Sequence, residues 1–60
     1  MKLKRWDVVM DLQGELYVVF GFPCLTEEFV TLLNGRTWYD DFIVRDTAYV
    51  NESFIKIGVI

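Results

Sequence analysis

The chain has no histidine and only one cysteine, Cys24, among its 60 residues. A single cysteine excludes a disulfide within the chain, and the absence of histidine leaves no Cys/His set for a structural zinc site. A nucleophilic cysteine needs a neighbouring base or cation, so catalysis through Cys24 is not expected. Its ordinary interpretation is a small, partly buried side chain beside Pro23.

Glycine is scarce as well, and the four glycines are far apart, so the chain has no glycine-rich phosphate loop. Four carboxylates lie close together in sequence, at Asp40, Asp41, Asp46 and Glu52. Their spacing does not match the alternating ligands of an EF-hand loop, and they are interpreted as solvated turn residues. The sequence therefore predicts a protein that is not an enzyme, with no catalytic residue, no cofactor and no metal site.

Long apolar runs are also absent. The longest uncharged stretch covers residues 16–25 and contains Gly21 and Pro23, which is well short of the roughly 20 residues that a membrane-spanning helix needs. The start of the chain is positive, but Asp7 and Asp11 interrupt the apolar segment that a signal peptide requires. Together with the unpaired cysteine, these features predict a soluble, cytoplasmic protein with no membrane contact.

Positive charge is concentrated at the start of the chain, at Lys2, Lys4 and Arg5, whereas the net charge of the whole chain is −3. Phosphate backbones are bound chiefly by Lys and Arg, so an acidic domain of this kind is a poor general nucleic-acid binder. Direct nucleic-acid binding is therefore not the leading prediction.

Aromatic side chains are what the chain has in excess, at 17% of its residues. A domain of this length buries only about 60% of the surface that its unfolded chain exposes. Some aromatic side chains must then lie at the surface, where they would form an apolar patch suited to a partner. The ten candidates are Trp6, Tyr17, Phe20, Phe22, Phe29, Trp38, Tyr39, Phe42, Tyr49 and Phe54.

The first half of the chain predicts a β-hairpin. Residues 6–11 alternate, with Asp7, Val9 and Asp11 on one side, as in a strand with one wetter face. Gly14 can adopt the positive φ of a tight connection, and residues 16–20 are rich in strand-forming side chains. Pro23 cannot donate to a sheet and ends the second strand, which makes residues 24–28 a connection.

Asn34-Gly35 is the strongest local signal, because it separates an apolar run, 29–33, from an aromatic one, 37–39. A two-residue type I′ turn needs positive φ at both positions, which Asn and Gly accept. Such a turn places Leu33 opposite Arg36 and Thr31 opposite Trp38. The same residues also admit a short helix over 26–35, with Asn34-Gly35 as its C-terminal cap.

The second half predicts two more strands. Asp40 and Asp41 mark a bend, residues 42–44 are extended, and residues 45–48 form the next break. The polar residues 51–53 suit one helical turn. A last strand follows over residues 54–60.

This order resembles the SH3-like small β-barrel. The similarity lies in residues 7–9, 16–19, 29–32 and 50–57, which match the strand and turn segments of small bacterial and phage proteins with this barrel. The resemblance implies an all-β fold, a five-stranded barrel with a single helical turn before the last strand, and one domain over residues 1–60. It also implies binding without catalysis, since such barrels usually act as interaction modules.

The leading functional prediction is therefore a protein-binding module with an exposed aromatic patch centred on Trp38. Whether Trp38 or its neighbour Tyr39 points outward depends on the register of the hairpin. An acidic rim would suit a basic surface on the partner. The predicted binding residues are Trp38, Tyr39, Asp40, Asp41, Tyr49, Glu27 and Glu28.

Small acidic proteins of this kind are frequently phage or plasmid regulators, which suggests an inhibitor or adaptor of a host protein. The same patch could close a homodimer. Two other classes stay open: a structural subunit of a larger assembly, and a nucleic-acid module. In the latter, Trp6, Tyr17 or Trp38 would stack on bases and Lys2, Lys4, Arg5 and Arg36 would hold phosphates.

Overall fold

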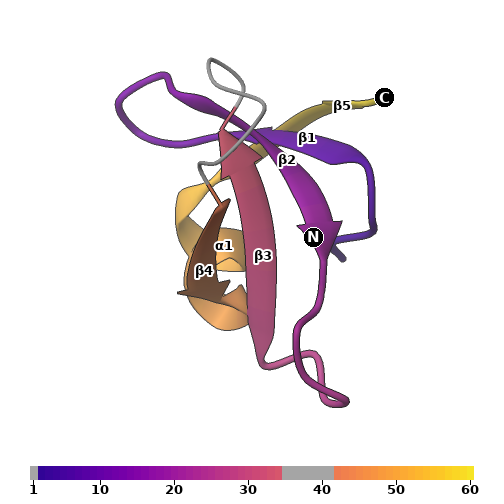
Figure 1. Ribbon diagram of the computed structural model, residues 1–60. Helices are drawn as coiled ribbons and strands as arrows, with labels where there is room; N and C mark the ends of the chain where they lie inside the picture. Colours follow the sequence, from indigo (N-terminus) through magenta and orange to yellow (C-terminus); the bar gives the residue numbers. More distant parts are fainter. Residues whose placement is uncertain (1, 35–41) are drawn as a thin grey trace.

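A computed structural model describes residues 2–34 and 42–60 of the chain, and these residues form one antiparallel sheet with a short helix (Figure 1). The elements follow the chain in the order β1 (Asp7–Met10), β2 (Leu16–Gly21), β3 (Phe29–Asn34), β4 (Phe42–Asp46), α1 (Thr47–Ser53) and β5 (Ile55–Val59). The spatial order of the strands is β4-β3-β2-β1-β5. The mostly β fold is thus confirmed, but the sheet does not close into a barrel.

The first hairpin, between β1 and β2, forms where it was predicted. Gly14 has a φ of 85°, in the left-handed region that glycine adopts without strain. The carboxylate of Asp11 accepts hydrogen bonds from the backbone N–H groups of Gln13, at 3.0 Å, and Glu15, at 2.9 Å. The Asp11 side chain therefore stabilises the turn, because its carboxylate takes the place of a backbone carbonyl as hydrogen-bond acceptor.

The two faces of β1 differ from the expected pattern. Asp7 and Val9 are buried, whereas Val8 and Met10 are only partly buried. The side that carries the aspartate, expected to be the wetter one, is therefore the core side. Alternation alone could not identify this side, because it shows which residues share a face and not which face the rest of the molecule covers.

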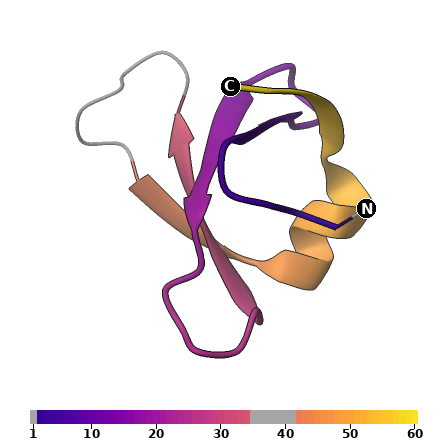
Figure 2. The ribbon, with the colours of Figure 1, turned by 90° about the vertical axis from the view of Figure 1, so that its right-hand side faces the viewer.

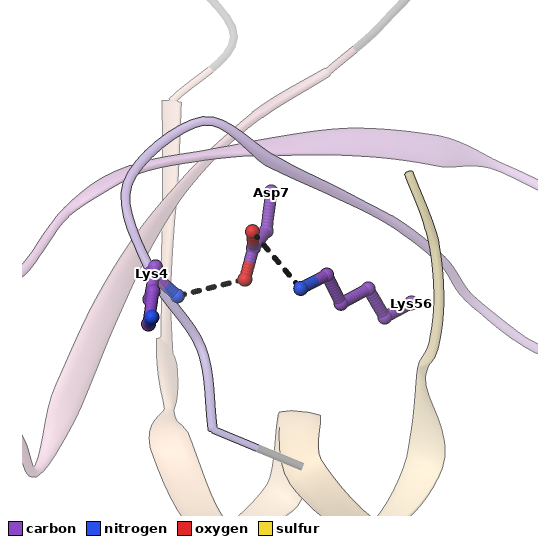
Figure 3. Close-up of polar contacts among 3 residues, drawn as sticks. All are labelled: Lys4, Asp7 and Lys56. Carbon is purple, nitrogen blue, oxygen red and sulfur yellow. Dashed lines mark hydrogen bonds and ion pairs between the residues drawn. The ribbon is translucent and has the colours of Figure 1, made fainter. Parts of the chain in front are cut away.

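Asp7 tolerates burial because both oxygens of its carboxylate have partners. The Lys4 backbone N–H donates to Asp7 Oδ2 at 2.8 Å, and Lys56 Nζ lies 3.4 Å from Asp7 Oδ1. Figure 3 shows Lys4 and Lys56 on two sides of the carboxylate. The contact joins the N-terminal segment, β1 and β5, and the Lys56 ammonium stays in part exposed to water.

The β3–β4 hairpin contradicts both structures that the sequence predicted around Asn34. Residues 29–34 form a strand, so the short helix over 26–35 is wrong. The two-residue turn is wrong as well, because Leu33 pairs with Phe42 and Leu32 with Ile43. This register lets Ile43 pack against the core cluster. The free energy gained by burying one face of the strand exceeds the local preference of Asn34-Gly35 for a tight turn.

Helix α1 is longer than the single turn expected over residues 51–53. It begins at Thr47 because the Asp46 carboxylate caps it, accepting from the backbone N–H groups of Ala48, at 2.9 Å, and Tyr49, at 3.4 Å. Residues 45–48, predicted to be a break, therefore hold the end of β4 and the start of α1. The helix buries Val50 against the sheet.

The core lies on one side of the sheet. In Figure 2, helix α1 and the N-terminal segment lie on the same side of β2, β3 and β4. Both contribute to the cluster of buried side chains, which comprises Leu3, Val9, Val19, Val30, Leu32, Val50 and Phe54. Val18 and Leu33 are buried as well but do not belong to this cluster, and they alternate along β2 and β3 with its members Val19 and Leu32. The face away from the cluster therefore carries both buried and exposed side chains.

Replacing Asp7 tests the polar contact beneath β5. We expect Asp7→Ala to lower the free energy of unfolding by about 2 kcal/mol, because it removes a buried, charge-assisted hydrogen bond. Urea denaturation followed by tryptophan fluorescence measures the change. Glu52→Ala, at an exposed position on α1, is the matched control and should stay within about 0.5 kcal/mol of the wild type. Equal stability of Asp7→Ala and the wild type would contradict the assignment.

Candidate functional site

Four of the seven predicted binding residues, Trp38, Tyr39, Asp40 and Asp41, lie outside the described residues. The other three, Tyr49, Glu27 and Glu28, are exposed but do not form one patch. Tyr49 lines a cleft beside the β1–β2 turn. Glu27 and Glu28 line a separate hollow with Asp46.

The cleft around Tyr49 is an aromatic site with polar edges. It has a volume of about 210 Å³ and lies between helix α1 and the β1–β2 turn. The Phe54 ring contacts Tyr49 at a centroid distance of 6.1 Å and Tyr17 at 5.7 Å. Asp11 and Arg45 bring one charge of each sign to its lining.

The environment of this cleft changes the acidity of Tyr17. Burial is the largest cause and raises the pKa of the Tyr17 hydroxyl above its usual value. The negative charges of Asp11 and Glu15 raise the pKa further, whereas Arg45 opposes them. The cleft therefore holds Tyr17 in its neutral form.

A second aromatic cluster lies on the face of the strands away from the core. Phe20 makes edge contacts with the Trp6 ring, at a centroid distance of 6.3 Å, and with the Phe42 ring, at 5.1 Å. Edge contacts of this kind add to the stabilisation that comes from apolar area alone. All three side chains nevertheless remain exposed.

Arg5 completes this cluster. Its guanidinium carbon lies 5.1 Å from the centroid of the Trp6 ring and 5.1 Å from that of Phe20. A cation over the face of an aromatic ring is attracted by the negative ring face. We call Arg5, Trp6, Phe20 and Phe42 the basic aromatic surface.

Backbone geometry explains why these residues meet. Trp6 has a φ of 76°, which is unusual for a residue with a side chain. Its N–H donates to the Val19 carbonyl at 2.8 Å and its carbonyl accepts from the Ile60 N–H at 2.9 Å. These bonds turn the chain so that Arg5 and Trp6 lie beside the end of β2.

The strands place the two phenylalanines. Phe20 lies at the point where the β2–β3 register shifts, between Val19 and Gly21. Phe42 opens β4, and its neighbour Ile43 packs against the core. Because successive strand residues point to opposite faces, Phe42 points away from the core.

A shallow groove of about 430 Å³ runs along this surface. Its lining residues are Arg5, Phe20, Gly21, Phe22, Pro23, Thr31 and Phe42. We call it the sheet groove. It is lined mostly by apolar and small side chains, with one charged group, Arg5.

Sequence reasoning identified the members of this surface only in part. The aromatic excess marked Trp6, Phe20 and Phe42 as candidates for exposure, and Arg5 and Trp6 entered the nucleic-acid alternative. No sequence signal placed Phe20 beside Phe42, because their contact depends on the register of β2, β3 and β4. The one local signal was the pair Arg5-Trp6 directly before the first strand, which places a cation next to an aromatic ring.

The structure also places the remaining candidates of the sequence. Cys24 is exposed, which corrects the expected partial burial, since the connection that holds it lies at the surface. In residues 2–34 and 42–60, no group of three or more His, Cys, Asp or Glu side chains could hold a metal ion. None of the described helices is long and apolar enough to cross a membrane.

Comparison with known proteins does not assign a family. No protein-family model matches the chain, and neither a curated protein nor a solved structure is similar enough to count as a match. The function must be argued from the geometry alone.

The Tyr17 environment predicts a dependence of stability on alkaline pH. Because its pKa is raised in the folded state, the stabilisation is fully present below a pH of about 10 and is lost as the pH rises through the raised pKa. Replacement of the hydroxyl in Tyr17→Phe should remove this part of the decrease. Urea denaturation of both proteins between roughly pH 8 and 11 measures the difference. Parallel curves for the two proteins would contradict the expectation.

Proposed function

We propose that the chain is a non-catalytic protein-binding module that contacts its partner through the basic aromatic surface. One observation carries the proposal: three exposed aromatic rings form a connected row, and the Arg5 guanidinium lies 5.1 Å from the centroids of two of them. Trp and Arg are enriched among the residues that dominate the energy of protein interfaces, and aromatic side chains are enriched in interface cores.

The connectivity of the sheet supports an SH3-like architecture as part of this proposal. The resemblance implied five strands and a helical turn before the last strand, and the five antiparallel strands with α1 before β5 are compatible with that order. In this proposal the five strands correspond to those of a small barrel that is open between the edge strands β4 and β5. Barrels of this class present exposed side chains to peptides, proteins or nucleic acids.

A regulator or inhibitor of a host protein, encoded by a phage or plasmid, is the specific role that we propose for such a module. Support comes from the small size, the acidic composition and the resemblance to small phage proteins. Self-association through the same surface is a competing use of it. A homodimer would bury the exposed rings and add to the stability of a small core.

A nucleic-acid module is the second candidate function, and one observation favours it. Lys2, Lys4 and Arg5 are all exposed, and the Arg5 guanidinium lies close to the rings of Trp6 and Phe20. Bases stack on aromatic rings while cations hold phosphates in proteins that bind single strands. Such binding weakens steeply as salt rises, whereas an apolar protein interface changes little.

Alanine variants of the basic aromatic surface test the protein-binding proposal. We expect Trp6→Ala and Phe20→Ala each to weaken partner binding about 10- to 100-fold, because central aromatic anchors contribute about 1–3 kcal/mol. The partner is first captured from lysate of the native host by wild-type protein, and affinities are then measured by biolayer interferometry. Urea denaturation confirms that each variant is folded.

Tyr49→Ala is the matched control. Tyr49 is 52% exposed and Trp6 is 45% exposed, so the two rings offer similar exposed fractions on different sites. Equal losses for Tyr49→Ala and Trp6→Ala would contradict the proposed location. Trp38→Ala belongs in the same series, because a loss confined to this variant would favour the patch predicted from the sequence.

A further inference from the structure

The basic aromatic surface has the opposite charge to the chain as a whole. Three of the six cationic side chains, Lys2, Lys4 and Arg5, lie in the segment that forms or precedes this surface, although the net charge is −3. All three are exposed. None of them forms an ion pair within the described part of the chain.

None of the described residues that line the sheet groove carries a carboxylate. Arg5 is the one charged side chain in this described lining, and apolar contact is offered by Phe20, Phe42 and Pro23. A ligand in this groove therefore meets positive charge at one end and aromatic rings along its walls. Complementary charge and shape then define what the groove accepts.

Arg5 is held in a geometry that suits a carboxylate. Its guanidinium carbon lies 5.1 Å from the centroids of both Trp6 and Phe20, and these two rings hold the positive charge beside the groove. A guanidinium has five N–H donors in a planar fork, and two of them can form parallel hydrogen bonds with one carboxylate. No described residue accepts a hydrogen bond from the Arg5 side chain.

We propose that the partner binds the sheet groove with a short acidic segment, in which a carboxylate engages Arg5 and an adjacent aromatic or large aliphatic side chain packs on the exposed surfaces of Phe20 and Phe42. This inference rests on the proposed function and names the chemistry of the partner. It differs from the basic partner surface that the acidic rim suggested, and the described members of that rim, Glu27 and Glu28, line a different hollow.

The charge pattern favours a peptide over a polynucleotide. The connection that supplies Pro23 to the groove continues to Glu27 and Glu28, both exposed. A phosphate backbone that left the groove along this connection would meet two carboxylates, and repulsion between like charges would oppose it. A short peptide with one or two acidic residues stays within the groove and does not reach Glu27 and Glu28.

Selection from a random octapeptide display library tests the proposal without assuming a sequence. We expect peptides recovered on wild-type protein to combine Asp or Glu with an adjacent aromatic or large aliphatic residue. Arg5→Glu should recover peptides rich in Lys or Arg instead, and Tyr49→Ala should recover the wild-type class. A double variant, Lys2→Glu and Lys4→Glu, changes the charge beside the groove and leaves the three aromatic side chains in place. We expect it to recover fewer peptides that contain Asp or Glu.

A double-mutant cycle then locates the carboxylate. The best acidic peptide and its Glu-to-Gln or Asp-to-Asn analogue are titrated by fluorescence anisotropy against wild-type protein and Arg5→Gln. The amide analogue should bind wild-type protein at least about tenfold more weakly, as expected for a charge-assisted contact, and should bind Arg5→Gln nearly as well as its parent. Equal losses on both proteins would overturn the pairing with Arg5.

The other outcomes separate this inference from the proposed function. Recovery of peptides without an acidic bias, with binding lost in Phe20→Ala, overturns the acidic partner and leaves the binding module in place. Absence of any enriched peptide overturns both. Oligothymidylate that binds more tightly than the best acidic peptide, with an affinity that falls steeply with salt, overturns the inference in favour of a single-stranded nucleic acid.

Discussion

The buried carboxylate of Asp7 is the interaction on which the arrangement of the N-terminal segment depends. One oxygen accepts the Lys4 N–H at 2.8 Å and the other lies 3.4 Å from Lys56 Nζ, so the segment before β1 and the edge strand β5 are held by the same group. Between Lys4 and Asp7 the chain must turn sharply, and Trp6 adopts a positive φ there. The exposure of Arg5 and Trp6 follows from this turn, because the backbone of Trp6 is bonded to β2 and to the C-terminal residue while its ring stays outside the core.

The aromatic excess of the chain is divided between two sites on different sides of the fold. Tyr17, Tyr49 and Phe54 meet beside helix α1, where Phe54 also belongs to the core cluster. The rings of the basic aromatic surface contact one another on the opposite face and leave a groove beside them. A small core cannot enclose so many rings. In the proposed function the exposed rings form the binding surface, and its positive charge comes from the few cations at the start of the chain.

Several elements could be predicted because their signals are local. Gly14 and Asp11 specify the first turn, the apolar run over residues 16–20 forms β2, and Pro23 follows the end of that strand. Helix α1 was underestimated because its start depends on one capping side chain, Asp46, which also ends β4. The expected acidic rim is described only in part, because Asp40 and Asp41 lie outside the described residues. Glu27 and Glu28 line a different hollow from the cleft of Tyr49, which no spacing in the sequence expresses.

The sequence by itself determined the extended segments of the first hairpin, where that hairpin turns, and that aromatic side chains must be exposed, because these depend on backbone preference and on the balance of surface and volume. Only the tertiary structure decided which side of β1 is buried and how β3 pairs with β4. Asn34 has the local chemistry of a tight turn, yet Leu33 pairs with Phe42, because this register buries Leu32 and directs Ile43 to the core. The same register brings Phe42 to Phe20 on the other face. Long-range pairing is therefore what creates the proposed binding surface from residues that are far apart in the chain.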